Sequence, residues 1–262
     1  MKFPLSNFLN RLFDNNLNSS LGNVGERIRA SIATRVSGCC LLCGARTIST
    51  QGFCAGCRTD LPWLTAAHCQ CCAHPLPAAG VCGRCLAEPP HYDAVIAACR
   101  YEFPVSGLIQ AYKYGGRLAI GPALATLWHT HQLPRPDRIV PMPLAAQRLR
   151  ERGFNQALEL ARVLGRALDV PVDAISCVKT RETPPQTRLP WKERRKNIRG
   201  AFVVQENLAD EHVLVVDDVL TTGATLHELA RNLKQAGAAV VTGCVVARTI
   251  SGNHAYRELN KS

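Results

Sequence analysis

The stretch from Val213 to Thr225 carries the strongest structural signals in the chain and reads Val213-Leu214-Val215-Val216-Asp217-Asp218-Val219-Leu220-Thr221-Thr222-Gly223-Ala224-Thr225. Its first four residues are apolar and mostly β-branched, which predicts a strand buried on both faces. Two carboxylates follow at the point where we expect that strand to end. Beyond the turn, apolar residues recur at helical spacing. The stretch therefore predicts a strand, a polar turn and a helix within an α/β fold that has a parallel sheet.

The turn after this strand is suited to an anion. In an open parallel sheet, ligands bind beyond the carboxyl ends of the strands, where helix N-termini point. The turn offers backbone N–H groups and threonine hydroxyls, and Gly223 lets a ligand approach the backbone closely. Asp217 and Asp218 can reach sugar hydroxyls or Mg²⁺. The residues thus predict a phosphate site with two carboxylates beside it.

The same stretch resembles the phosphoribosyl pyrophosphate (PRPP) motif of the type I phosphoribosyltransferases almost throughout. The resemblance implies a type I phosphoribosyltransferase-like parallel sheet with flanking helices. It also implies that Asp217 and Asp218 bind the ribose and Mg²⁺. The residues implied to hold the 5′-phosphate are Thr221, Thr222, Gly223, Ala224 and Thr225.

Composition and charge limit the class of protein. A chain of 262 residues suits one larger domain plus a small module, and 47% hydrophobic residues allow a full core, which excludes a collagen-like or wholly disordered chain. The net charge of +11 favours polyanionic partners such as phosphorylated ligands, nucleic acid or acidic membrane. No apolar run approaches the length of a membrane span and no signal peptide is visible. Thirteen cysteines, eight of them in Cys-x-x-Cys pairs, favour reduced thiolates on metal, so we expect a cytoplasmic protein.

Four Cys-x-x-Cys pairs form the strongest metal signal. Each pair supplies two thiolates from one tight turn, and two pairs complete a tetrahedral Zn²⁺ shell. Two consecutive zinc ribbons are the simplest assignment, although the sequence leaves interleaved pairing open, and Cys39 or Cys71 could replace a neighbouring ligand. The zinc should be structural, since a segment this short cannot build much of a core. The predicted ligands are Cys40, Cys43, Cys54, Cys57, Cys69, Cys72, Cys82 and Cys85.

The composition divides the chain into four segments. Residues 1–37 begin with apolar residues at helical spacing, which fits either an amphipathic helix that contacts a membrane or partner, or a disordered extension. We predict a double zinc ribbon over 38–88, a phosphoribosyltransferase-like domain over 91–250 and a polar tail over 251–262. Further strands are predicted in Tyr92–Tyr101, Arg138–Leu144, Ala201–Val204 and Ala239–Ala247, the last near the interior of the sheet.

Three cations outside the main motif are candidates for anion binding. Lys113 precedes a glycine-rich turn and is either a ligand contact or a solvated helix end. Arg148 and Arg152 follow the second predicted core strand and precede a helix. Arginine grips phosphate with two hydrogen bonds, so this loop is either a second anion site or a set of surface arginines. In position it resembles the pyrophosphate loop of the glutamine-PRPP amidotransferase branch.

The segment from Lys179 to Gly200 is the most basic part of the chain. Its eight cations against two glutamates give +6, more than half of the total charge, and three prolines keep its first half from forming a helix. It resembles the flexible loop that closes over the active site of phosphoribosyltransferases, where cations would stabilise the pyrophosphate. Trp191 beside these cations also fits single-stranded DNA, with a base stacked on the indole. The loop residues assigned to pyrophosphate are Arg181, Arg194, Arg195 and Lys196.

From Cys39 to Ala247 the arrangement resembles the ComF/GntX family. The resemblance is carried by the double Cys-x-x-Cys module, the PRPP motif and three further segments: Lys113-Tyr114-Gly115, Arg152-Gly153-Phe154-Asn155-Gln156, and Gln186-Thr187 through Asn197. It implies a phosphoribosyltransferase-like domain preceded by a zinc finger and linked to natural competence. Family members help to handle imported single-stranded DNA or to use external DNA.

Two functions therefore compete. One is an active phosphoribosyltransferase, in which an unidentified nucleophile displaces pyrophosphate from PRPP·Mg²⁺ under the 179–200 loop. The other, which we favour, is a DNA-handling factor of competence that binds PRPP, with ribbons and basic loop contacting single-stranded DNA or other DNA-uptake proteins. A PRPP motif predicts binding better than turnover, and no residue stands out as a catalytic base. The acceptor, the oligomeric state and contact with the inner face of the cytoplasmic membrane stay open.

Overall fold

The computed structural model of the chain describes residues 38–47, 51–65, 67–115, 117–130, 133, 135–181 and 196–250. The predictions for residues 1–37, for Trp191, Arg194 and Arg195, and for the tail from 251 to 262 lie outside the described residues. No helix in the described part is long and apolar enough to span a bilayer.

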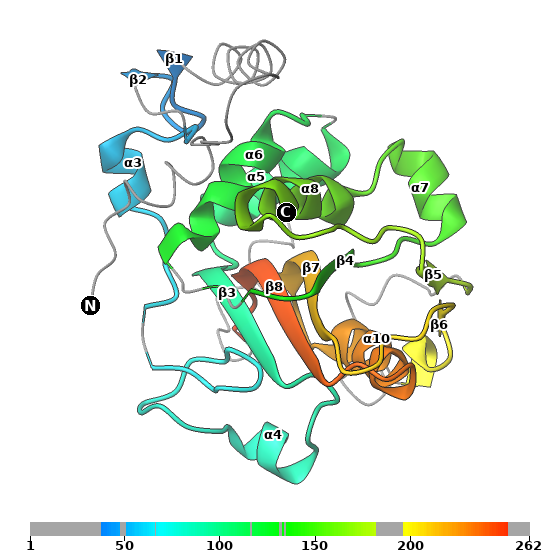
Figure 1. Ribbon diagram of the computed structural model, residues 1–262. Coiled ribbons are helices and arrows are strands. Elements are labelled where there is room, and N and C mark those ends of the chain that lie inside the picture. The colour runs from blue at the N-terminus through cyan, green and yellow to red at the C-terminus, as the bar shows by residue number, and fades with distance from the viewer. Residues whose placement is uncertain are drawn as a thin grey trace, which may run out of the picture.

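A four-stranded parallel sheet lies at the centre of the molecule (Figure 1), with the strand order β3-β8-β7-β4. The strands are β3 (Ala94–Arg100), β4 (Arg138–Pro141), β7 (His212–Leu220) and β8 (Val240–Arg248). β8 is an interior strand, as predicted. Side chains of β7 alternate between the two faces, with Val213 and Val215 in one core and Leu214 and Val216 in the other. The strand is therefore buried on both faces, which explains its continuous apolar run.

Strand β7 is longer than the sequence suggests. We expected it to end before Asp217, but its pairing with β8 continues from Asp217↔Val245 to Leu220↔Arg248. On the other side, β4 ends at Pro141, opposite Val216. The prediction of the strand's end is therefore wrong, and the physical reason is that β8 supplies hydrogen-bond partners where β4 no longer does. Asp217 and Asp218 therefore lie on the part of β7 that extends beyond the end of β4, where β7 has no partner from β4.

Helices cover both faces of the sheet. One face carries α5 (Val105–Tyr114), α6 (Ile120–Ala125), the 3₁₀ helix η1 (Thr126–Thr130) and α8 (Gln156–Leu168). The other carries α10 (Ala224–Gln235) and an antiparallel pair formed by β5 (Cys177–Lys179) and β6 (Phe202–Val204). The short helix α7 (Ala146–Arg152) follows β4 at the rim (Figure 1).

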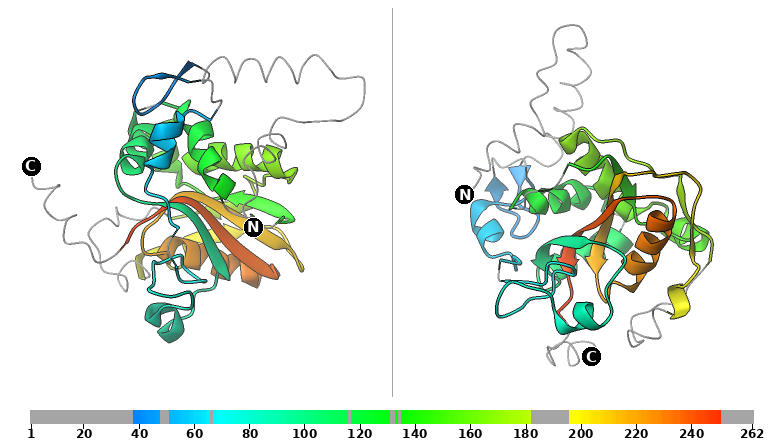
Figure 2. Two further views of the ribbon diagram at one scale, coloured as in Figure 1. Left: turned by 90° about the vertical axis from the view of Figure 1, so that its left-hand side faces the viewer. Right: turned by 60° about the horizontal axis from the view of Figure 1, so that its bottom comes forward.

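The two zinc ribbons pack on opposite faces of the sheet. The first contains β1 (Gly38–Cys39), β2 (Arg46–Thr47) and α3 (Ala55–Thr59), and its Phe53 and Leu61 join the core beneath α5, α6 and α8. The second contains α4 (Gly83–Ala87), and its cysteines join the core on the α10 side. Figure 2 shows α3 above the sheet and α4 below it. The sheet therefore lies between the two ribbons.

The chain passes from one ribbon to the other along the edge of β3. Leu64 N–H donates to Ala98 O at 3.0 Å, and Arg100 N–H donates to Pro62 O at 2.7 Å. These residues form a short antiparallel contact with the edge strand. Packing is therefore continuous between the ribbons and the sheet, while the boundary near residues 88–91 stays a prediction.

Candidate functional site

The turn between β7 and α10 has the backbone that its glycine predicts. Gly223 caps α10 with φ of 82°, in the left-handed region that favours glycine. A Cβ atom at this position would lie 2.8 Å from the hydroxyl oxygen of Tyr92, which packs over the turn. Thr222 Oγ1 accepts a weak hydrogen bond of 3.4 Å from Ala224 N–H. The turn therefore presents the N-terminus of a three-turn helix, where an anion is favoured.

Asp218 and Lys113 form an ion pair beside this turn. Lys113 Nζ lies 2.9 Å from Asp218 Oδ1, and the side chains are 18% and 3% exposed. The other oxygen of the carboxylate, Oδ2, is buried and has no hydrogen-bond partner among the residues that the structure describes. Burial is the largest influence on the pKa of Lys113 and lowers it, but the charge and the hydrogen bond of Asp218, together with the charge of Asp217, raise the pKa above its ordinary value, so the lysine is a cation. The structure thus brings together two residues that are separated by more than a hundred positions.

Asp217 is half-buried in the same place. Its Oδ1 accepts a hydrogen bond of 2.8 Å from Asp218 N–H. Burial and, secondly, the charge of Asp218 raise the pKa of Asp217 to about 7, while Lys113 and Lys179 pull it down. Lys179, at the end of β5, is therefore close enough to influence the site electrostatically. The sequence-based prediction placed Lys179 among the cations of the basic loop and did not assign it to the site.

A small cavity of about 40 Å³ opens between the turn and the strand ends. Its lining includes Met142, Asp217, Thr221, Gly223 and Thr225, which come from the exit of β4, from β7 and from the turn. All of these belong to the carboxyl ends of the strands, where open α/β sheets bind their ligands. Four of the predicted ribose and phosphate residues therefore line one common space, while Asp218, Thr222 and Ala224 are not among its lining residues.

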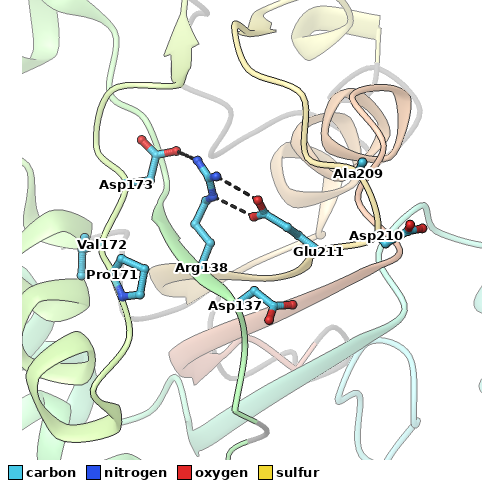
Figure 3. Close-up of a pocket in the computed structure, with 8 residues that line it drawn as sticks. All are labelled: Asp137, Arg138, Pro171, Val172, Asp173, Ala209, Asp210 and Glu211. Carbon is cyan, nitrogen blue, oxygen red and sulfur yellow. Dashed lines mark hydrogen bonds and ion pairs between the residues drawn. The ribbon is translucent and has the colours of Figure 1, made fainter.

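A larger hollow of about 500 Å³ lies at the opposite ends of β4 and β7 (Figure 3). At its centre, Arg138 pairs with Asp173 at 2.7 Å and with Glu211 at 2.8 Å. It also contacts Glu206 at 2.6 Å. One guanidinium faces three carboxylates here, so the group keeps a net negative charge, and its ion pairs tie the starts of two strands to neighbouring loops. We assign this hollow a structural role because it lies away from the helix N-terminus and the two aspartates.

Asn155 links the exit of β4 to helix α8. Its Oδ1 accepts hydrogen bonds from Ala157 N–H at 2.9 Å and Leu158 N–H at 3.4 Å, which makes it the N-cap of α8. Its Nδ2 donates to Met142 O at 3.2 Å. The asparagine of the Arg152–Gln156 segment thus holds the loop that follows β4, next to the cavity.

The arginines predicted as a second anion site lie on α7. The Arg152 guanidinium stacks on Tyr114, with Cζ 5.1 Å from the ring centroid, and Arg152 Nη2 donates to Tyr114 Oη at 3.3 Å. Because Tyr114 follows Lys113, this pair stands near the Lys113–Asp218 ion pair. Arg148 is half-buried one turn earlier on the same helix. Their assignment to pyrophosphate stays a prediction.

The described ends of the basic loop are tied to the same region. Arg181 Nη2 donates to Asn197 O at 2.7 Å and to Arg199 O at 2.9 Å, which joins the two ends of the loop. Gly200 N–H donates to Glu228 Oε1, on α10, at 2.8 Å. Lys196 is exposed. The loop is therefore anchored to α10, the helix that begins at the turn after β7.

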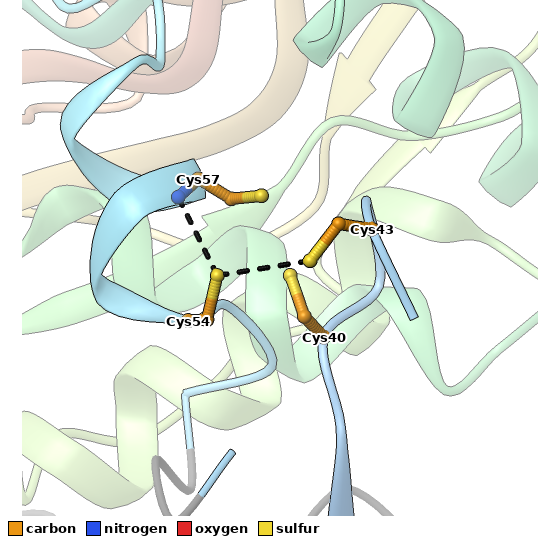
Figure 4. A group of neighbouring side chains, drawn as sticks. All are labelled: Cys40, Cys43, Cys54 and Cys57. Carbon is orange, nitrogen blue, oxygen red and sulfur yellow. Dashed lines mark hydrogen bonds between the residues drawn. The ribbon is translucent and has the colours of Figure 1, made fainter. Parts of the chain in front are cut away.

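The eight predicted metal ligands form two separate groups, Cys40/Cys43/Cys54/Cys57 and Cys69/Cys72/Cys82/Cys85, and the sulfur atoms of each group lie within 4.8 Å of one another. The pairing is therefore consecutive rather than interleaved. Figure 4 shows the first group converging from a loop and from α3. In each group one sulfur pair is 3.8 Å apart, which is about the separation of thiolates at 2.3 Å from a tetrahedral Zn²⁺. The geometry fits two structural zinc ions.

Two arginines that the sequence did not assign connect the second group to the turn. Arg84 Nη1 donates to Thr222 O at 3.2 Å, and Arg248 donates to the carbonyls of Leu220 and Thr221. The one available signal for Arg248 was a charge at the end of an apolar strand. Nothing in the local sequence of Arg84 indicated a contact 138 residues away.

Comparisons with known proteins agree with this architecture. The model of the phosphoribosyl transferase domain matches residues 151–261, and the model of the double zinc ribbon domain matches residues 37–86. Among solved structures, a purine phosphoribosyltransferase from Pyrococcus horikoshii aligns with 52% of this chain and 82% of its own at 21% identity, but the TM-score of 0.29 is too low to support an argument.

Curated relatives match most of the chain. The DNA utilization protein YhgH of Escherichia coli is 34% identical over 221 residues, which cover 81% of this chain and 91% of the relative. Competence protein F of Haemophilus influenzae is 35% identical over 76% of this chain and 91% of its own. Competence protein ComFC of Bacillus subtilis is 29% identical over 72% and 80%. The chain therefore belongs to the ComF family of competence and DNA utilization proteins, in which a phosphoribosyltransferase-like fold is combined with a double zinc ribbon.

Proposed function

We propose that the site at the β7–α10 turn binds PRPP with Mg²⁺, and that the chain uses this ligand while it handles imported single-stranded DNA in the cytoplasm. The ligand proposal is carried by one observation: Asp218 Oδ2 is buried beside a helix N-terminus and has no hydrogen-bond partner in the described part of the chain. Leaving a buried polar atom unpaired costs about 1–3 kcal/mol. A ribose hydroxyl or a water bound to Mg²⁺ would remove that cost.

The neighbouring groups fit the remaining parts of the ligand. The turn from Thr221 to Thr225 would hold the 5′-phosphate with backbone N–H groups and hydroxyls. Lys113 would pass from Asp218 towards the pyrophosphate, since its ammonium can be shared between two anions. The basic loop, with Arg181 and Lys196 at its described ends, would supply further positive charge. Mg²⁺ would take carboxylate oxygens from Asp217 or Asp218 together with phosphate oxygens.

Calorimetry with PRPP and Mg²⁺ tests this assignment. Replacing both carboxylates, Asp217→Asn with Asp218→Asn, should weaken binding by at least tenfold, about 1.4 kcal/mol, because hydrogen bonds to charged groups contribute about 1.5–3 kcal/mol each. Asp210→Asn is the matched control, because Asp210 is exposed at the opposite end of the sheet with φ of 63°, a conformation that asparagine tolerates. Equal binding by the wild type and the double variant, or no binding by either, would overturn the assignment.

Catalysis needs a separate assay. Transfer would form a bond from an acceptor nucleophile to the anomeric carbon and break the bond from that carbon to pyrophosphate. Pyrophosphate release from PRPP, measured with candidate bases and amines, distinguishes an enzyme from a PRPP-binding factor.

Contact with single-stranded DNA is favoured by the surface around Tyr114. The tyrosine is 69% exposed and carries the Arg152 guanidinium on its ring. Exposed Arg117 and Arg150 lie on the segments next to this pair. An exposed aromatic ring with nearby cations is the combination that stacks a base and holds its phosphate, and each stacked base contributes about 1–3 kcal/mol.

Titration of a labelled oligonucleotide at several salt concentrations tests the DNA proposal. Tyr114→Ala should weaken binding by about tenfold with little change in salt dependence, whereas Arg152→Ala should reduce the salt slope. Phe103→Ala is the control, because Phe103 is 85% exposed at the other end of α5. Equal affinities of the Tyr114→Ala and Phe103→Ala variants would contradict a stacking role for Tyr114.

A further inference from the structure

The second zinc ribbon contacts the phosphate turn through two arginines. Arg84 lies on α4 between the ligands Cys82 and Cys85, and its Nη1 donates to Thr222 O at 3.2 Å. Arg248 ends β8 and is 1% exposed. Its Nε donates to Cys72 O at 2.9 Å, and its Nη1 donates to the carbonyls of Leu220 and Thr221. The Arg248 guanidinium therefore donates hydrogen bonds both to Cys72, a predicted zinc ligand, and to the turn.

The zinc centre supplies the negative charge that these cations need. One Zn²⁺ with four thiolates carries two net negative charges, and all four cysteines of the second group are buried. Both guanidiniums lie within electrostatic reach of the Cys72 sulfur. Among the described residues, the hydrogen bonds of Arg248 go to carbonyl and hydroxyl oxygens rather than to a carboxylate. A buried cation is costly unless an anion compensates it, so zinc bound by the four cysteines would stabilise Arg248 in its buried position.

The arginines also set the direction of the peptide groups in the turn. In a trans peptide the C=O and the following N–H point in opposite directions. Arg248 holds the carbonyl of Thr221 and Arg84 holds that of Thr222, so both carbonyls face the ribbon. The N–H groups of Thr222 and Gly223 consequently point away from the ribbon. Donors in this direction suit the phosphate that the turn is proposed to bind.

We propose that Arg84 and Arg248 are positioning residues which couple the second zinc centre to the phosphate turn, so that zinc and PRPP stabilise each other's binding. This inference rests on the proposed function. Coupling between two binding sites is reciprocal, so PRPP must raise the affinity of the second ribbon for zinc by the same factor as zinc raises the affinity for PRPP. The first ribbon lies on the other face of the sheet and should not respond.

Zinc release reports the coupling, because we expect tighter binding of zinc to slow its loss to a chelator. The folded protein with two zinc ions is mixed with a zinc-selective chromogenic chelator, with and without PRPP·Mg²⁺, and zinc content and circular dichroism are recorded for every variant. In the wild type, PRPP should slow the release of one zinc ion by about tenfold and leave the other unchanged. Arg84→Ala and Arg248→Lys should remove this protection and weaken PRPP binding by about tenfold, the effect of one charge-assisted hydrogen bond.

Arg58→Ala is the matched control. Arg58 belongs to the first ribbon, where its Nη2 donates to Thr126 O at 3.4 Å and its guanidinium stacks on Trp63. This variant should keep both the affinity for PRPP and the protection of one zinc ion. Arg84→Gln, which keeps an amide donor for Thr222 O without the charge, serves if Arg84→Ala fails to retain zinc.

The outcomes separate the two proposals. If the wild type binds PRPP but both zinc ions leave at unchanged rates, the coupling is refuted and the ligand assignment stands. If the arginine variants keep full protection, Arg84 and Arg248 have no positioning role. If the wild type binds no PRPP, the proposed function fails and the coupling falls with it.

Discussion

At the phosphate turn, Gly223 is the residue with the least freedom to change. Its φ of 82° is strained for any other residue, and the Tyr92 hydroxyl fills the place of a Cβ atom. We predict that Gly223→Ala lowers stability by about 1–3 kcal/mol and weakens PRPP binding by tenfold or more. Chemical denaturation and calorimetry measure the two effects. Gly107→Ala is the control, because Gly107 lies within α5 with open space around it, and alanine there should be neutral or stabilising.

The raised pKa of Asp217 predicts that the affinity for the ligand depends on pH. Burial and the adjacent Asp218 raise the pKa of Asp217 to about 7. In the proposed site the ionised form would bind Mg²⁺ and accept hydrogen bonds from ribose hydroxyls, so below pH 7 the ligand would have to displace a proton. We therefore expect PRPP affinity to rise with pH and to level off above about 7, with a limiting slope of about tenfold per pH unit below it.

Calorimetry between pH 5.5 and 8.5 checks this dependence, with Asp217→Asn as the reference for titration of the ligand itself. The same raised pKa means that the unliganded protein loses stability as the pH rises from about 4 towards 7, because the unfolded carboxyl ionises first. A wild-type profile parallel to that of the variant would show that Asp217 does not titrate in the site.

Helix α8 is the element that connects the exit of β4 to the core. Asn155 caps the helix and also donates to Met142 O. We predict that Asn155→Ala lowers stability by about 1 kcal/mol and weakens PRPP binding, because the loop after β4 loses its anchor. Asn155→Asp keeps an acceptor for the cap and loses the donor, so it should retain stability and still bind PRPP less tightly. If neither variant lost affinity for PRPP, a role for this loop in the site would be excluded.

Strands and metal ligands could be predicted where the residues that determine them are close together in the sequence. The apolar run from Val213 to Val216 predicted a doubly buried strand, and the spacing of the cysteine pairs predicted the metal ligands. The end of β7 was not predictable, because it depends on hydrogen bonds from β8 to residues that carry charged side chains. The contacts of Arg84 and Arg248 were not predictable either, since they join segments 138 and 176 residues apart.

At the scale of the whole molecule, the two ribbons pack on opposite faces of the same sheet. The sequence showed two similar modules in a row and gave no sign that they pack on different faces, because that depends on residues 62–64 running along β3. Each ribbon adds buried side chains to a different core. Loss of either metal should therefore destabilise the sheet, with different consequences for the ligand.

We predict that Cys54→Ser and Cys82→Ser each reduce the zinc content from two ions to one. Either change should lower the Tm by about 5 °C or more, since each kcal/mol moves the Tm of a chain of this size by about 2–4 °C. Cys82→Ser should also weaken PRPP binding by about tenfold, whereas Cys54→Ser should leave it nearly unchanged. Cys39→Ser is the control, because Cys39 is exposed and belongs to neither group. Elemental analysis and thermal unfolding decide the matter, and loss of zinc in Cys39→Ser would contradict the ligand assignment.

The strand order has a consequence for how the chain is made. β3 and β4 are synthesised first, yet they occupy the two edges of the sheet, and their partners β8 and β7 come from the C-terminal part. Until β7 and β8 have left the ribosome, β4 and β3 lack their partners in the sheet. During that interval the ribbons, complete by residue 85, are the parts able to bind their metal and fold. Zinc bound at this stage would place residues 62–64 along one edge of β3 before β8 is made, and so shield that edge from aggregation.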